Sequence, residues 1–287
     1  MKHVAERSYE QLIARVTKAA RQPSVQMETL GRFESGGRRC ALVQLNLGRA
    51  DVGKLPVMIA AGIHGDEPAG VEAAIRFLET NAQNQSLLSR FHFVVFPCNN
   101  PSGWELNTRQ NADGIDLNRR FATRNPPAEV AIVTRALQGR RFDLIFEMHE
   151  DVDASGFYLY EIVDDARARV GDEIVGKVCS LGFPVNHNRQ IEGMAAHGGV
   201  IRPRLTRFRK TRLPQAIYAH RTCGGHVLTL EPPASVLSLE DRVLIELTGL
   251  ELALRAALGE PANAEIVSGG QAAGCRLSPI RLRTKKQ

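Results

Sequence analysis

One histidine and one glutamate, His64 and Glu67, lie three residues apart directly after the continuous apolar run 55–63. Such a run is typical of a central strand buried on both faces, and α/β proteins form their sites at the carboxyl ends of parallel strands. At this spacing an imidazole and a carboxylate can reach one ion, and the pair suits zinc. A polar loop ahead of a helix would have the same composition, so the motif alone leaves both interpretations open.

A second histidine has an equivalent position. Among the eight histidines, His64 and His149 are the two that directly follow predicted core strands, His149 coming after the strand-like run 142–148. A catalytic zinc site needs three protein ligands and an open position. The shared placement therefore favours His149 as a third ligand over an ordinary core or surface histidine.

Two further segments carry polar groups suited to chemistry. The irregular stretch 100–121 contains Arg109, Asn118 and Arg119, and long irregular stretches inside compact domains are often functional. Glu231 ends the predicted strand that begins at His226. Taken alone, a glutamate at that position is as easily solvated as catalytic.

The ordered set of these residues resembles the M14 zinc carboxypeptidase family, whose superfamily includes aspartoacylase and succinylglutamate desuccinylase. The resemblance covers about residues 55–233. The motifs that carry it are His64-x-x-Glu67, Asn100-Pro101, Arg109, Asp116-Leu117-Asn118-Arg119, His149 and Thr229-x-Glu231.

The resemblance implies one Zn²⁺ ion held by His64, Glu67 and His149. Two neutral histidines and one carboxylate leave such a site net positive. A bound water then becomes acidic and a bound carbonyl is polarised.

It also implies the roles of the remaining residues. Glu231 takes a proton from the water and passes it to the leaving amine. Arg109 stabilises the developing oxyanion, while Asn118 and Arg119 grip the free carboxylate of the substrate. Members of the family commonly place a tyrosine shortly before the catalytic glutamate, and Tyr218 is the candidate for this substrate-binding role.

Two other tyrosines, Tyr158 and Tyr160, lie too close to His149 in the sequence to match that pattern. We therefore do not expect them in the tyrosine role.

The same metal ligands and catalytic residues would serve two enzymatic functions. One is a zinc-dependent metallocarboxypeptidase that uses a metal-activated water to hydrolyse the C-terminal amide bond of a small peptide, with cell-wall peptides as one candidate. The other is a zinc amidohydrolase that deacylates an N-acyl amino acid. In the deacylase branch the metal motif usually lies near the N-terminus and a β-rich domain follows the glutamate. Here 63 residues precede His64 and 56 follow Glu231, which favours the carboxypeptidase.

Predicted strands and helices alternate along the chain. This predicts an α/β fold with a mixed, mostly parallel central sheet flanked by helices on both faces, as one catalytic domain over 1–275 followed by a basic tail, 276–287. The predicted helices are 9–21, 68–80, 127–137, 166–181 and 235–258, the last with Ser235 or Ser238 as its N-cap; the predicted strands are two within 25–47, then 55–63, 91–97, 142–148 and 226–230.

The net charge of +6, from 37 basic and 31 acidic residues, comes from two segments. The stretch 202–221 has seven basic side chains and the tail 276–287 has five, and neither contains an acid. Removing these twelve charges leaves −6 for the rest of the chain. Since Phe208 and Tyr218 are the aromatic residues of the first stretch, no base-stacking platform is evident and we expect no nucleic-acid partner.

Pro203 and Pro214 suggest that this first basic stretch is a loop. We expect it to form part of the rim over the metal and to attract a small peptide or acyl-amino-acid substrate that bears a free carboxylate.

Five cysteines without a CxxC spacing predict neither a disulfide framework nor a four-thiolate zinc site. The first ten residues have no apolar segment typical of a signal peptide, and no apolar run reaches the length of a membrane span. A cytoplasmic location without membrane association is the expectation.

Overall fold

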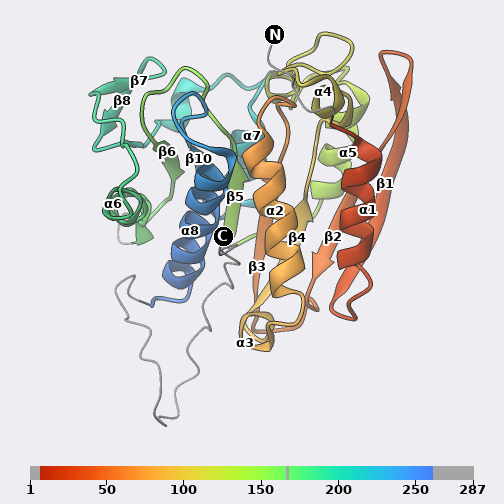
Figure 1. The fold of residues 1–287 in the computed structure, drawn as a ribbon, viewed down its shortest axis with the longest axis horizontal. Helices are drawn as coiled ribbons and strands as arrows, with labels where there is room; N and C mark the ends of the chain where they lie inside the picture. Colours follow the sequence, from red (N-terminus) through yellow and green to blue (C-terminus); the bar gives the residue numbers. More distant parts are fainter. Residues whose placement is uncertain (1–6, 166–167, 261–287) are drawn as a thin grey trace.

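The computed structural model describes residues 7–165 and 168–260, which form one ten-stranded sheet covered by helices (Figure 1). The sheet order is β1-β2-β4-β3-β5-β10-β6-β9-β8-β7. The strands are β1 (Val25–Ser35), β2 (Arg38–Leu47), β3 (Leu55–Ala61), β4 (Phe91–Phe96), β5 (Leu144–Met148), β6 (Tyr158–Ile162), β7 (Gln190–Ile191), β8 (Met194–His197), β9 (Val200–Ile201) and β10 (His226–Glu231).

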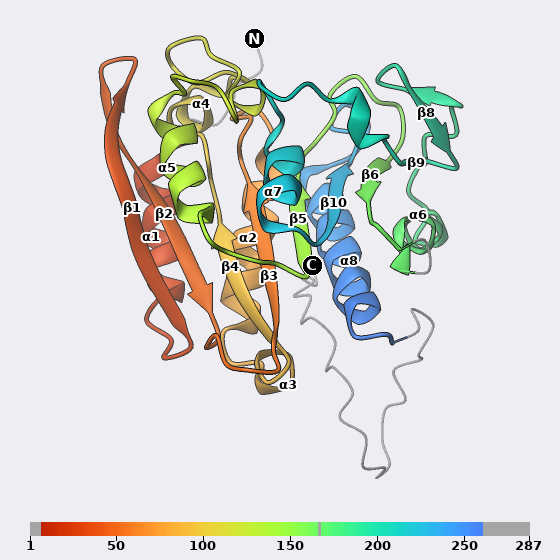
Figure 2. The same ribbon diagram turned by 180° about the vertical axis from the view of Figure 1, so that it is seen from behind.

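The centre of the sheet is parallel and its flanks are largely antiparallel. Strands β4, β3, β5 and β10 pair in parallel, whereas β1 with β2, β2 with β4, and β10 with β6 pair antiparallel. This confirms the predicted mixed α/β fold. The carboxyl ends of β3, β5 and β10 meet at the same edge, the upper one in Figure 2.

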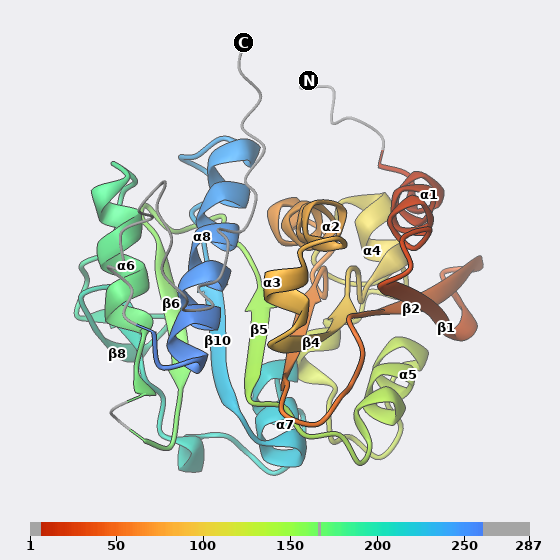
Figure 3. The same ribbon diagram turned by 90° about the horizontal axis from the view of Figure 1, so that it is seen from below.

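Helices cover both faces of the sheet (Figure 3). Helices α1, α2, α6 and α8 lie on one face, and α5 and α7 lie on the other. The α-helices are α1 (Tyr9–Ala19), α2 (Pro68–Asn81), α3 (Gln85–Leu88), α4 (Pro101–Leu106), α5 (Ala128–Leu137), α6 (Gly171–Ser180), α7 (Gln215–Cys223) and α8 (Leu239–Ala257).

The core lies between these layers. Apolar side chains of β3 alternate between the two faces, with Val57 and Ile59 in the cluster under α2 and α8, and Met58 and Ala60 in the cluster under α5 and α7. Burial on both faces explains the continuous apolar run in the sequence.

Most predicted elements are present with ends shifted by a few residues. Ser238 caps α8, since its hydroxyl accepts from the backbone N–H of Asp241. Helix α6 begins at Gly171, five residues later than predicted. The predicted tail 276–287 lies outside the described residues.

Two elements near the site were not predicted. Strand β6 is only five residues long and contains the buried Glu161, which obscures its apolar pattern. Helix α7 begins within the basic stretch 202–221, so that stretch is a loop only up to Pro214, and this loop contains a short 3-10 helix, Leu205–Arg207. The apolar face of α7, which includes Ile217 and Ala219, is hidden in the sequence by polar neighbours.

Within residues 7–165 and 168–260, no helix is both long enough and apolar enough to span a membrane.

Candidate metal and catalytic site

The loop after β3 is held close to the backbone of α4. A Cβ atom on Gly65 would lie 1.9 Å from the carbonyl carbon of Gly103, so only glycine allows this approach. Helix α2 then begins with Pro68. Glu67 occupies the N-cap position but makes no side-chain capping bond, which leaves its carboxylate to face the two histidines.

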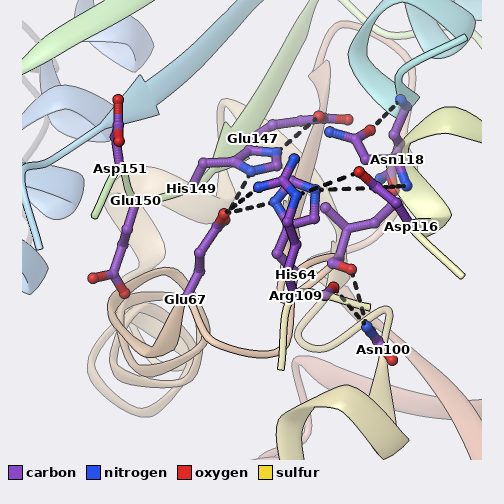
Figure 4. Close-up of polar contacts among 12 residues, drawn as sticks. His64, Glu67, Asn100, Arg109, Asp116, Asn118, Glu147, His149, Glu150 and Asp151 are labelled. Atoms are coloured by element: carbon purple, nitrogen blue, oxygen red, sulfur yellow. Dashed lines mark hydrogen bonds and ion pairs between the residues drawn. The ribbon is translucent and has the colours of Figure 1, made fainter. Parts of the chain in front are cut away.

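The three predicted metal ligands converge on one point (Figure 4). The Nδ1 atoms of His64 and His149 lie 2.6 Å and 2.9 Å from the two carboxylate oxygens of Glu67. One ligand atom from each residue lies within 4.8 Å of the others, and all three residues are buried. This is a candidate site for one metal ion.

The charge of Glu67 is stabilised by its neighbours. Burial alone would raise its pKa, but the His64 and His149 rings outweigh burial, and the pKa of Glu67 falls below its ordinary value. The carboxylate is therefore held in the ionised form that a metal ligand requires.

Asp116 connects the ligand cluster to the predicted substrate-binding loop. Its Oδ1 atom lies 3.5 Å from Nε2 of His64 and accepts from the backbone N–H of Asn118 at 3.0 Å, while Oδ2 accepts from Nε of Arg109 at 3.3 Å. Burial would raise the pKa of Asp116, but the nearby His64 and Arg109 lower it overall. A carboxylate behind a ligand imidazole fixes the orientation of the ring. Asp116 is part of the sequence motif, but an aspartate in a loop does not by itself indicate that it contacts a ligand histidine.

Two acidic residues on either side of His149 were missed from the sequence. Oε2 of Glu147 lies 3.7 Å from Nε2 of His149. Glu150 accepts from the backbone N–H of Ala69 and forms an ion pair with Arg242 of α8. Glu150 therefore ties the segment that carries His149 to the start of α2, which carries Glu67.

A pocket of about 470 Å³ opens over the cluster. It brings together most of the residues singled out from the sequence. The predicted residues that line it are His64, Glu67, Arg109, Asn118, Arg119, His149 and Glu231.

Glu231 lies at the end of β10, beside the cluster. The protein around its carboxylate excludes water and raises the pKa of Glu231; the neighbouring carboxylates Glu67 and Asp151 raise it further, against the lowering effect of His149 and Arg109. A raised carboxyl pKa suits a group that must both accept and return a proton.

Asn118 has a fixed orientation. Its Oδ1 atom accepts from the backbone N–H of Gln215 at 2.7 Å, which leaves its Nδ2 group to donate toward the pocket. The guanidinium of Arg119 donates to the backbone carbonyl of Asn118 at 2.9 Å and also lines the pocket.

The position of Tyr218 does not fit its predicted role. Tyr218 packs against Phe121, with ring centroids 5.4 Å apart, and is not among the residues that line the pocket. Instead Tyr158 and Tyr160 of β6 line it. Neither was expected at the site, because both lie close to His149 in the sequence. Antiparallel pairing of β6 with β10 nevertheless brings Tyr158 opposite Glu231.

The basic stretch 202–221 borders the pocket through its uncharged residues. Pro203, Phe208, Pro214 and Ile217 line the wall, and none of the basic side chains of the stretch does. Arg202 instead pairs with acidic groups on β6 and α6. The stretch contributes to the rim, but its positive charges face elsewhere.

Zinc fits the chemistry of the cluster. Two imidazoles and one carboxylate are a donor set that zinc accepts in catalytic sites, and the pocket leaves the remaining coordination positions accessible. Carboxylates also stand behind both rings, as is usual for metal-bound histidine.

Comparisons with known proteins agree with this assignment. A family model described as zinc carboxypeptidase matches residues 13–134. Murein peptide amidase A of Escherichia coli (strain K12) is 43% identical over 68 residues, a match that covers 24% of this chain and only 26% of that protein.

Solved structures show the same fold. A metallo-carboxypeptidase from Burkholderia cenocepacia matches with a TM-score of 0.68 at 18% identity, covering 88% of this chain and 70% of that one. Carboxypeptidase A from Helicoverpa armigera matches with a TM-score of 0.65 at 16% identity, covering 88% and 74%. The chain is thus similar to the zinc carboxypeptidase family over residues 13–134, and it has the fold of these two carboxypeptidases.

Proposed function

We propose that the protein is a zinc-dependent metallocarboxypeptidase that hydrolyses the C-terminal amide bond of a small peptide. The observation that carries this proposal is the composition of one pocket: it holds the ligand cluster and Glu231 together with Asn118 and Arg119. A catalytic centre and a carboxylate-binding pair in one cavity suit a substrate whose scissile bond lies next to a free carboxylate.

His64, Glu67 and His149 would hold the zinc ion. When bound, zinc would polarise the scissile carbonyl and lower the pKa of water at the site. Glu231 would accept the proton of the attacking water and return it to the leaving amine. Arg109, held by Asp116, would stabilise the negative charge that develops on the carbonyl oxygen.

Asn118 and Arg119 would bind the substrate's terminal carboxylate. The Nδ2 group of Asn118 has a fixed direction, and an arginine fork can bind both oxygens of a carboxylate. This pair would make the reaction specific for the end of a peptide.

The substrate class is supported by the relative named murein peptide amidase A. We propose small peptides, with those of the cell-wall type as one candidate. The match covers 26% of that relative's length.

The proposal is tested by incubating the zinc-loaded protein with three substrate sets: peptides with a free C-terminus, the same peptides as C-terminal amides, and N-acyl amino acids. We expect release of the last residue from the free peptides and no release from the amides. Release from the N-acyl amino acids alone would reject the proposal in favour of a deacylase.

We also propose a single catalytic domain over 1–275 and a cytoplasmic location. The described cysteines, Cys40, Cys98, Cys179 and Cys223, are free thiols, and this supports a reducing compartment. Cell fractionation with a compartment marker tests the location; recovery with secreted proteins would contradict it.

A further inference from the structure

The sheet arranges the pocket floor in successive rows of side chains. Residues two apart on a strand point to the same face, and paired residues on neighbouring strands lie side by side. The row beside the metal ligands is formed by Glu231 and its β6 partner Tyr158, and the next row inward pairs Thr229 with Glu147 on β5 and with Tyr160 on β6. A third row pairs Val227 with Ile162.

Glu147 is an unusual residue for this second row. It is 2% exposed and lines the pocket, and its Oε1 atom is buried without a hydrogen-bond partner among the described residues. Its Oε2 atom lies 3.7 Å from the ring of His149. One oxygen of the carboxylate therefore faces a ligand ring, and the other lacks a partner at the pocket floor.

A buried carboxylate oxygen without a partner is costly unless a positive group or a donor satisfies it. No arginine or lysine forms an ion pair with Glu147 within residues 7–165 and 168–260. The missing partner is therefore best supplied by the ligand of the pocket.

The walls next to Glu147 are apolar. Ile162, Val227 and Ile217 line the pocket and are almost fully buried. Apolar walls that end at a carboxylate fit an alkyl chain with a terminal cation, because the methylene groups pack on the walls while the charge pairs with the acid.

The spacing of the rows sets the length of the alkyl chain that the pocket can accept. Two residues of strand separate the row of Glu231 from that of Glu147, which corresponds to about 6.7 Å. A side chain that enters the pocket beside the scissile bond would need the stem length of a lysine-type residue to reach Glu147.

We infer that Glu147 is a specificity-determining residue that selects peptides whose C-terminal residue carries an alkyl chain ending in an ammonium group. This inference rests on the proposed carboxypeptidase function. Asn118 and Arg119 would bind the terminal carboxylate, and Glu147 would bind the cation at the other end of the same residue. Both charges that the C-terminal residue carries in the uncleaved peptide would then be matched within one pocket.

The test compares two peptides that differ only at the last residue, lysine or norleucine, which has the same aliphatic chain without the ammonium group. For the wild-type, zinc-loaded protein we expect kcat/KM to favour the lysine peptide on the order of 10- to 100-fold. In Glu147→Gln, assayed at a zinc concentration that saturates the site, we expect the ratio to fall close to one, through loss on the lysine peptide.

The matched control is Glu173→Gln, which removes one negative charge from an exposed position on α6. It should keep the wild-type ratio. A wild-type ratio near one would overturn the inference without any variant, and so would an equal loss on both peptides in Glu147→Gln, because Glu147 would then act only through His149.

A binding measurement separates this inference from the proposed function. If the zinc-loaded protein releases no residue from any peptide, the carboxypeptidase proposal fails. Calorimetric titration with free L-lysine and L-norleucine then decides the inference alone. Tighter binding of lysine that is lost in Glu147→Gln supports it, and equal binding of the two overturns it.

Discussion

Strand β10 has a cluster of charged and polar side chains near each end, and the two clusters have similar compositions. At its start His226 and Arg202 both contact Glu161, and beyond its end Glu67 and His149 meet beside Arg109. Each cluster contains histidine, glutamate and arginine around a buried carboxylate. Only the second borders the pocket.

The two clusters differ in how their polar atoms are satisfied. Glu161 accepts from the backbone N–H groups of Val170 and Gly171, from Nε2 of His226 and from the guanidinium of Arg202. The metal cluster instead turns two imidazole nitrogens and a carboxylate toward one point that can hold an ion. A cluster whose polar atoms are all hydrogen-bonded stabilises the fold. Ligand atoms that face an open cavity can instead bind an ion and a substrate.

The largest effect should come from Glu231→Gln. If Glu231 carries the proton, the substitution should lower kcat by roughly 10²–10⁴-fold while zinc content stays at the wild-type level. Peptidase assays and metal analysis of the same preparation measure both. Glu161→Gln, in the other cluster, is the matched control and should retain turnover per folded molecule. Unchanged turnover in Glu231→Gln would remove this residue from the mechanism.

The next effect concerns stability and pH. Burial opposes the charge of Glu161, but His226, the two backbone N–H groups and Arg202 lower its pKa to about 2, against an ordinary 4.5. A lowered folded-state pKa adds stability above pH 4.5 that is lost as the pH falls toward 2. The corresponding free energy is about 3 kcal/mol.

Denaturant unfolding of wild type and Glu161→Gln should therefore differ by about this amount at pH 7 and by much less near pH 2. A difference that does not change with pH would show that the charge of Glu161 is not the source of the stability.

A smaller effect is expected for Asp116→Asn. This substitution weakens the support of His64 and of Arg109 while it keeps the side-chain size. Loss of a carboxylate behind a metal ligand lowers metal affinity roughly 10- to 100-fold. Competition with a zinc chelator measures the change, and Asp113→Asn, in the same loop, provides the comparison. Equal zinc affinity in the two variants would argue against a role of Asp116 at the metal.

The smallest effect is expected in the basic stretch. Arg209 and Lys210 are exposed and lie outside the pocket lining, so replacing both by alanine should leave KM for peptides almost unchanged and stability within about 0.5 kcal/mol. A clear rise in KM with a weaker salt dependence would instead show that the stretch attracts substrate electrostatically.

The sequence predicted the central strands and the residues that follow them, because burial on both faces leaves long apolar runs that end in polar groups. It did not indicate a role for Glu161, because only tertiary contacts bring His226 and Arg202 to that carboxylate. Tyr158 and Tyr160 were not expected at the site, because they lie close to His149 in the sequence. Their proximity to Glu231 depends on antiparallel pairing of β6 with β10, which chain distance does not reveal.

The most direct test of the account is the zinc content per chain of His149→Ala compared with His226→Ala. Both substitutions remove a histidine that contacts a buried glutamate. The account predicts about one zinc per chain in wild type and in His226→Ala, and almost none in His149→Ala. Full zinc occupancy in His149→Ala would contradict the proposed ligand set.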